Sequence, residues 1–261
     1  MDIVSSVLLG LIQGLSEFAP VSSSGHLVLA HVFLGAGAQD LAFDALLHVA
    51  TVLAIIVYFW RDIVRIAIDF LTWHAPQQGT AIIVATIPGV VLGVFLEDAM
   101  NTLFRNPLLV AVTLTIGSVV MLYAEYVYRR ITVPVETLSW KRALGVGLFQ
   151  SLALIPGMSR SGMTISGGML LGLSRTQAAR FGFLLGVPIL LGAGGKKFVE
   201  LYSTGALGTI GTEALVGAVV AFVSGILVIH YLLAFLRRYS LHAFVVYRLL
   251  IAATIVLFFA L

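Results

Sequence analysis

Long apolar runs separated by short polar breaks extend along the whole chain, and their lengths predict its helices. A helix needs about 20 apolar residues to cross the hydrocarbon core of a membrane. Two stretches, at about 2–34 and 143–173, are interrupted by polar residues, so that each apolar piece covers only about half that distance. Each stretch predicts a helix, a loop and a second helix that enter the membrane and turn back. Six other runs are close to full length, at about 42–60, 80–96, 108–128, 178–195, 213–236 and 242–261.

The second half of the chain repeats the plan of the first. Residues 10–13 and 147–150 share the pattern Gly-Leu-x-Gln, and residues 22–25 and 159–162 share Ser-x-Ser-Gly, both at an offset of 137. Each half then holds one interrupted hairpin and three spans. Because three is odd, the two halves should cross the membrane in opposite directions. Interrupted segments at corresponding places in two such repeats point to a binding site where they meet.

These patterns predict an all-α integral membrane protein with about six transmembrane helices and two re-entrant helix hairpins, arranged as two inverted-topology repeats. We expect a single membrane domain over residues 1–261, with the repeats at about 1–130 and 140–261. Ten Lys and Arg residues fall on one side of this topology and three on the other, which assigns the first side to the cytoplasm. The first hairpin then enters from outside and the second from the cytoplasm.

Composition agrees with this class and excludes others. Hydrophobic residues make up 60% of the chain and charged residues 10%. The net charge of +3 is small and scattered, so that no nucleic-acid partner is expected. The chain has no cysteine, which excludes disulfides, cysteine zinc sites and a thiol nucleophile.

The second polar break, residues 156–164, has the composition of an anion site. Pro156 and Gly157 must end the helix before it, because proline lacks an N–H and glycine opens backbone angles that other residues avoid. A charge at membrane depth is costly, so Arg160 should face a cavity, and an arginine with clustered hydroxyls at a helix start suits a phosphate. The hydroxyls belong to Ser159, Ser161 and Thr164. The alternative, a surface loop between two spans, is disfavoured by the short neighbouring runs.

The first polar break offers a carboxylate, hydroxyls and an imidazole within about ten residues. They belong to Glu17, Ser22, Ser23, Ser24 and His26. Phosphoryl transfer needs such groups together with positive charge and often a divalent cation. Gln13 lies four residues before Glu17 on the same helical face, and the two can hold a hard cation such as Mg²⁺ or Ca²⁺ through oxygen.

The sequence leaves the individual roles in the first break open. Ser23 is a candidate nucleophile, and His26 is a candidate base, acid or nucleophile. Ser22 and Ser24 are candidate phosphate ligands, but serines at the start of a helix often only cap it. Whether Ser23, His26 or an activated water attacks phosphorus does not follow from the residues alone.

Other polar and small residues receive structural interpretations. His48 stands alone in the sequence, and Arg248 and Glu125 lie near span ends, where long side chains can extend toward the interface. Glycines four residues apart indicate close helix packing. These pairs are Gly10/Gly14, Gly89/Gly93, Gly168/Gly172 and Gly182/Gly186.

The two breaks together resemble the signature motifs of the BacA family of undecaprenyl pyrophosphate phosphatases. Residues 13–26, Gln-Gly-Leu-Ser-Glu-Phe-Ala-Pro-Val-Ser-Ser-Ser-Gly-His, are similar to its (Glu/Gln)-x-x-x-Glu and Ser/His motif. Residues 156–164, Pro-Gly-Met-Ser-Arg-Ser-Gly-Met-Thr, are similar to its second signature. The resemblance implies functional positions at Glu17, Ser23, His26, Ser159, Arg160 and Thr164. At residue 13 this chain carries Gln, the less acidic of two options, which weakens the case for direct metal binding there.

The resemblance implies hydrolysis of undecaprenyl diphosphate to the monophosphate carrier lipid, which recycles the carrier for cell-wall synthesis and confers bacitracin resistance. It also implies a multi-pass protein of the bacterial inner membrane. If the protein is this enzyme, the diphosphate enters from outside, so we expect the site to open to the periplasmic side. Expected partners are the polyprenyl diphosphate and membrane lipids, with a homodimer as a further candidate assembly. A flippase or transporter of the polyprenyl phosphate lipid is the alternative, because secondary transporters share this architecture. A PAP2-type phosphatase is excluded, because no Lys-x6-Arg-Pro motif precedes Ser24-Gly25-His26.

Overall fold

The computed structural model describes residues 2–33, 41–96, 106–135, 138–203 and 211–259, and the regular structure in these ranges is α-helical. The helices of the first half are α1 (Ile3–Phe18), α2 (Ser23–Phe33), α3 (Leu41–Tyr58), α4 (Trp60–Leu71), α5 (Gln77–Phe95) and α7 (Pro107–Tyr128). Those of the second half are α8 (Trp140–Leu152), α9 (Arg160–Leu170), α10 (Arg175–Ser203), α11 (Thr212–Leu236) and α12 (His242–Phe259).

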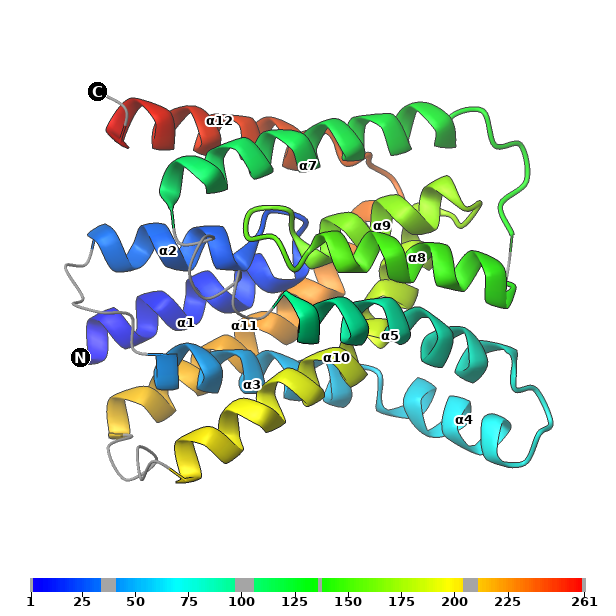
Figure 1. Ribbon diagram of the computed structural model, residues 1–261, viewed down its shortest axis with the longest axis horizontal. Helices are drawn as coiled ribbons and strands as arrows, with labels where there is room; N and C mark the ends of the chain where they lie inside the picture. The colour runs from blue at the N-terminus through cyan, green and yellow to red at the C-terminus, as the bar shows by residue number, and fades with distance from the viewer. Residues whose placement is uncertain (1, 34–40, 97–105, 136–137, 204–210, 260–261) are drawn as a thin grey trace.

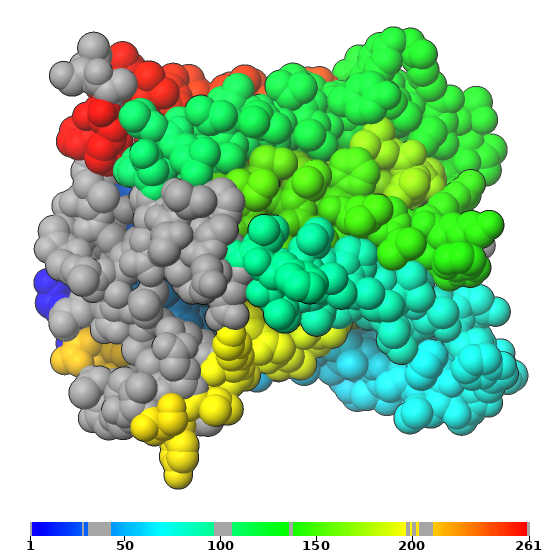
Figure 2. Space-filling view, viewed as in Figure 1, coloured from blue at the N-terminus to red at the C-terminus, as the bar shows by residue number. Residues whose placement is uncertain are grey.

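Five of these helices, α5, α7, α10, α11 and α12, are long and apolar enough to cross a membrane. The bent pair α3 and α4 raises the number to six if it is one span. Large apolar side chains such as Phe95, Leu250 and Phe258 are exposed on the outside of the bundle, where lipid replaces water as the solvent. Figure 2 shows side chains of α4, α5, α7 and α8 forming one face of this bundle. The prediction of an all-α multi-pass membrane protein is therefore confirmed.

Between the apolar runs at 42–60 and 80–96 the sequence predicts a loop and no helix. That prediction is wrong, because α4 occupies Trp60–Leu71 at an angle of 74° to α3. None of its residues is fully buried, although Ile63 and Ile66 pack against the core. Arg61 and Arg65 are exposed and lie four residues apart on the face opposite these isoleucines, which is typical of a helix at a membrane interface. The segment was predicted to be a loop because its Arg and Asp residues make it polar, although they recur with the period of an amphipathic helix.

The two short hairpins approach the centre of the molecule from opposite ends (Figure 1). The hairpin α1–α2 enters from the end that carries the N-terminus, and α8–α9 enters from the other. Both interrupted stretches of the sequence are thus helix–loop–helix units, and their loops lie side by side.

Equivalent glycines set the packing of both hairpins. A Cβ on Gly10 of α1 would collide with the carbonyl oxygen of Gly217 in α11, and a Cβ on Gly147 of α8 would collide with that of Ala85 in α5. Close backbone approach therefore explains these glycines, as predicted for Gly10/Gly14. Helices α5 and α11 correspond to the second of the three spans predicted for each half. Each hairpin therefore packs on the corresponding helix of the other half. Two inverted repeats would pack each hairpin on the other half in this way. The boundaries of the repeats stay a prediction.

An aromatic cluster fixes the inner end of α1. The rings of Phe18 and Phe183 meet edge to face with centroids 5.6 Å apart, and Phe59 lies 6.3 Å from Phe183. All three are almost fully buried. Edge-to-face pairs of this kind contribute about 0.5–1.5 kcal/mol beyond the area they bury. Because Phe18 directly follows Glu17, this cluster also fixes the position of that carboxylate.

Candidate active site

The loops of the two hairpins share an unusual backbone conformation. Ser22 and Ser159, which occupy the same position in the two halves, have φ angles of 76° and 72°. Each hydroxyl accepts a hydrogen bond from a backbone N–H three residues later, that of Gly25 or Gly162. These serines therefore cap α2 and α9, the role that the sequence left as an alternative for Ser22. Left-handed φ angles at residues other than glycine cost about 1–3 kcal/mol and concentrate at functional sites.

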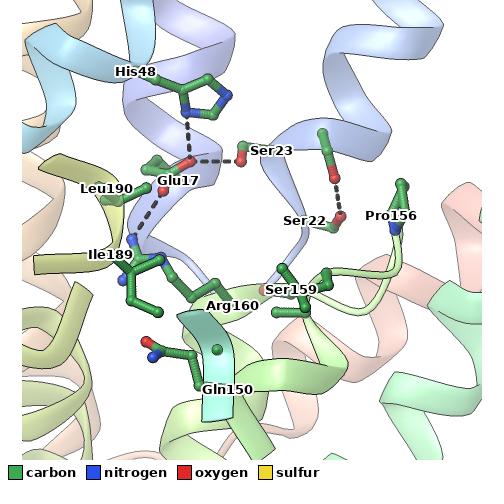
Figure 3. Close-up of a pocket in the computed structure, with 14 residues that line it drawn as sticks. Glu17, Ser22, Ser23, His48, Gln150, Pro156, Ser159, Arg160, Ile189 and Leu190 are labelled. Carbon is green, nitrogen blue, oxygen red and sulfur yellow. Dashed lines mark hydrogen bonds and ion pairs between the residues drawn. The ribbon is translucent and has the colours of Figure 1, made fainter. Parts of the chain in front are cut away.

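An ion pair joins the two loops. Arg160 Nη2 lies 2.8 Å from Glu17 Oε1, and the two side chains are only 11% and 5% exposed. Ser23 Oγ donates to the other carboxylate oxygen of Glu17 at 2.6 Å (Figure 3). Ser161 Oγ donates to the carbonyl of Ala19 at 2.9 Å and adds a second contact between the loops. The carboxylate, the guanidinium and one serine hydroxyl therefore converge between oppositely directed hairpins.

Two further side chains complete the surroundings of Glu17. Gln13 Nε2 donates to Glu17 Oε2 at 3.1 Å and lies 2.9 Å from His48 Nδ1. The same His48 nitrogen is 3.7 Å from Glu17 Oε2. The interpretation of His48 as an isolated structural residue is therefore wrong. No local pattern could identify it, because α3 reaches this site only through packing.

A cavity of about 280 Å³ opens beside these groups (Figure 3). One part of its wall is polar, and the other is apolar, with Leu154, Ile189 and Leu190. Its polar lining consists of Glu17, Ser22, Ser23, Ser24, His48, Gln150, Ser159 and Arg160. Such a division suits a ligand with an anionic group and a hydrocarbon chain.

His26 does not line this cavity. Its Nδ1 donates to the carbonyl of Ser22 at 2.8 Å, because that oxygen can only accept. Its Nε2 lies 2.8 Å from Tyr247 Oη, and the two rings stack with centroids 5.6 Å apart. Both ring nitrogens of His26 are therefore engaged, by the serine loop and by α12, and its predicted catalytic role gains no support from this geometry.

Two predicted phosphate ligands also point elsewhere. Thr164 Oγ1 donates to the carbonyls of Arg160 and Ser161, at 2.9 and 3.2 Å, within its own helix. Ser161 donates to Ala19, as described above, and contacts Ser159 Oγ at 3.2 Å. Neither Thr164 nor Ser161 lines the cavity. Helical geometry explains the direction of Thr164, since a hydroxyl in a first turn readily bonds carbonyls three or four residues back. The hydroxyl of Ser161 is instead used in the contact between the two loops.

Arg248 does not extend to an interface as predicted, but is completely buried. Its guanidinium donates to the carbonyls of Pro20 at 3.4 Å and Gly157 at 2.9 Å, one from each loop. It also donates to the carbonyl of Leu114 at 3.0 Å and to Ser118 Oγ at 3.1 Å. A single cation therefore ties both loops to α7. The sequence signal was an arginine within an otherwise apolar helix, which usually faces the interior of a bundle.

Glu125 is likewise buried, with 1% exposure, rather than extended toward an interface. Its Oε1 accepts from Arg175 Nε and from the backbone N–H of Leu241, both at 2.8 Å. This group joins α7, α10 and the start of α12. It lies outside the cavity lining and is structural.

Two glycines of α10 make room for the functional helix α9. A Cβ on Gly186 would collide with the guanidinium of Arg160, and a Cβ on Gly182 would collide with Thr164 Oγ1. The predicted close packing at Gly182/Gly186 is thus present, but it accommodates side chains rather than a second helix backbone. Arg160 also donates to the carbonyl of Gly182 at 3.5 Å.

The donor set limits how a cation could bind. Among the described residues, no group of three or more His, Cys, Asp or Glu side chains could hold a metal ion. Glu17 is the carboxylate at the cavity, and both of its oxygens already accept hydrogen bonds. Gln13 Oε1, however, is buried without a partner. These residues fit Mg²⁺ or Ca²⁺ only where water and phosphate oxygens supply most of the ligands, which is the usual arrangement for Mg²⁺.

Comparison with known proteins identifies the family of this chain. Residues 6–254 match the family described as bacitracin resistance protein BacA. An undecaprenyl-diphosphatase from Moorella thermoacetica is 41% identical over 262 aligned residues, covering 99% of this chain and 98% of the relative. Proteins of the same name from Rubrobacter xylanophilus and Mycobacterium leprae are each 40% identical and cover at least 97% of this chain and 93% of their own lengths. The chain therefore belongs to the BacA family.

Proposed function

We propose that this protein hydrolyses undecaprenyl diphosphate to undecaprenyl phosphate and inorganic phosphate. The reaction would recycle the carrier lipid for cell-wall synthesis and confer resistance to bacitracin. The observation that carries the proposal is the contact of Arg160 with Glu17 across the two loops, with Ser23 on the same carboxylate. These are the positive charge, base and hydroxyl that phosphoryl transfer requires.

The cavity would orient the substrate by polarity. The terminal phosphate would lie by Arg160, Ser23 and Ser159, which line the cavity. The hydrocarbon chain would leave past Leu154 and Leu190 toward the lipid-facing surface. A guanidinium suits this task because its planar fork can donate to two phosphate oxygens at once.

Ser23 supplies the attacking hydroxyl in this proposal. As its oxygen bonds to the terminal phosphorus, its proton passes to Glu17, and the bond from that phosphorus to the bridging oxygen breaks. The lipid monophosphate leaves, water then attacks the phosphoserine, and inorganic phosphate departs as Ser23 regains a proton. His26 would hold the serine loop instead of transferring protons, because both of its ring nitrogens are engaged with Ser22 and Tyr247.

A divalent cation would bind together with the substrate, held by Glu17 and by the unpartnered Oε1 of Gln13. When bound, it would neutralise charge on the diphosphate. We further propose that the cavity opens to the outer, periplasmic side of the membrane. The excess of Lys and Arg on the opposite side of the topology supports this orientation. A homodimer stays a prediction.

Phosphate release tests the proposed function directly. Purified protein in detergent should release phosphate from undecaprenyl diphosphate with Mg²⁺ or Ca²⁺, and a chelator should stop the release. Spheroplasts given the substrate from outside should release phosphate too, which tests the outward opening. Movement of labelled lipid between leaflets without any phosphate release would instead contradict the proposal and identify a lipid transporter.

Substituting Gly186 by alanine should lower kcat/KM for this substrate about tenfold or more. The added methyl group would occupy the space of the Arg160 guanidinium, so the cation must shift from its position beside Glu17. Gly192→Ala is the matched control, because it lies in the same helix and a Cβ there meets nothing within 4 Å. Equal steady-state rates for both variants would show that the position of the guanidinium is not critical.

A further inference from the structure

Gln150 of α8 is a buried amide that nothing in the described structure satisfies. Its side chain is 3% exposed, and neither Oε1 nor Nε2 has a hydrogen-bond partner. It nevertheless lines the cavity beside Arg160. An unsatisfied polar group in the interior is costly, so such a group in a native protein calls for an explanation, and a ligand is one.

The repeat shows why this amide is unsatisfied. Gln13, its equivalent in the first half, donates to the carboxylate of Glu17 four residues later and contacts His48. Four residues after Gln150 the chain has Leu154 instead of a carboxylate. The second hairpin thus keeps the amide but lacks its internal acceptor, which leaves Gln150 available to a ligand.

The surroundings of Gln150 define which part of a ligand it would meet. A Cβ on Gly89 would lie 3.6 Å from Gln150 Nε2 and touch Ile189, so the amide borders the apolar part of the wall. In the view of Figure 3, Arg160 lies between Glu17 and Gln150. Arg160 Nε is buried and also lacks a partner. Two donors without partners, Gln150 Nε2 and Arg160 Nε, are therefore present near the apolar wall, along which the hydrocarbon chain lies in the proposed binding mode.

We propose that Gln150 binds the phosphate that remains on the lipid. This inference rests on the proposed function, because the terminal phosphate is assigned there to Arg160, Ser23 and Ser159. The lipid-proximal phosphate must then lie nearer to the apolar wall, where Gln150 Nε2 can donate to its oxygens. A neutral amide adds affinity and orientation without a second fixed positive charge, which allows the monophosphate product to leave.

The test compares Gln150→Met, which keeps the size of the side chain and removes the amide, with the unaltered protein. In detergent, KM for undecaprenyl diphosphate should rise about tenfold or more, as expected for loss of one hydrogen bond to a charged group, while kcat changes less than about threefold. Binding of farnesyl monophosphate, measured by calorimetry, should weaken by a similar factor. Binding of inorganic phosphate should not change.

Thermal stability separates this role from a structural one. Removing an amide that lacks partners should leave the melting temperature of the free protein unchanged or raise it. Ser166→Ala is the matched control, since Ser166 Oγ is also buried and unpartnered but does not line the cavity. It should change neither KM nor monophosphate affinity. Gln150→Glu, which places a carboxylate at the same position, should weaken monophosphate binding further by repulsion.

Clear results would overturn the inference. Unchanged farnesyl monophosphate affinity in both Gln150 variants would exclude contact with the lipid-proximal phosphate. Loss of inorganic phosphate binding alone would assign Gln150 to the terminal phosphate instead. If the unaltered protein releases no phosphate but its monophosphate affinity still depends on Gln150, the hydrolytic function fails while the binding role stands.

Discussion

Arg160→Lys should lower kcat/KM for undecaprenyl diphosphate by about 10²–10³-fold, the usual loss when a donor to developing charge is removed. Lysine keeps the positive charge, so Glu17 is still compensated, but it lacks the planar fork that donates to several acceptors at once. In the structure, Arg160 donates to Glu17 at 2.8 Å and to the carbonyl of Gly182 at 3.5 Å. An ammonium group that replaces it cannot bond Glu17 and two phosphate oxygens in the same geometry.

Steady-state phosphate release measures this effect, and size-exclusion chromatography verifies that the variant stays folded. Arg65→Lys is the control, because Arg65 is 63% exposed, pairs with Asp62 and does not line the cavity. Its rate should equal that of the unaltered protein. A rate for Arg160→Lys within twofold of the unaltered enzyme would mean that only charge is needed at this position, and that the proposed bidentate contact with phosphate is absent.

Arg248→Met should destabilise the protein by about 3–5 kcal/mol, because buried carbonyls of both loops lose their donor. The substitution removes a buried cation but leaves the carbonyls of Pro20, Leu114 and Gly157 without that donor. Each unsatisfied buried acceptor costs about 1–3 kcal/mol. For a chain of this size the change corresponds to a fall in melting temperature of about 10 °C.

Thermal unfolding in detergent, followed by circular dichroism, measures this loss. Arg238→Met provides the comparison, because Arg238 is exposed and lies in the connection between α11 and α12. It should leave the melting temperature unchanged. Arg248 bonds both loops, so the variant should also release phosphate more slowly at temperatures below its melting temperature, where it is still folded. A melting temperature within about 2 °C of the unaltered protein would show that water or neighbouring groups satisfy the carbonyls, and that the arginine does not fix the loops.

The hairpins and their contact could be predicted because their signals are local. The sequence predicted two helix–loop–helix units from three signals. These are the half-length apolar runs, the proline that precedes the serines in each break, and the repeated Ser-x-Ser-Gly segment. The odd number of spans between them required opposite directions. The meeting of Glu17 and Arg160, 143 residues apart in the chain, followed from that topology and is present as an ion pair.

Side-chain direction could not be predicted in the same way. Ser161 and Thr164 follow Arg160 closely, yet their hydroxyls bond carbonyls and point out of the cavity. His26 lies three residues after Ser23 but faces Tyr247 of α12. On a helix, neighbours three or four residues apart share a face, but which face meets the cavity depends on the helices packed around it.

The amino-acid sequence by itself determined the membrane class, the two broken hairpins and the polar groups at their loops, because hydrophobic period, proline breaks and charge act over a few residues. Only the tertiary structure decided that His48 adjoins Glu17, that Arg248 is buried between the loops, and that Gln150 is left without a partner. These relations join helices far apart in the chain, and close packing of their surfaces, rather than any local propensity, selects which buried groups meet.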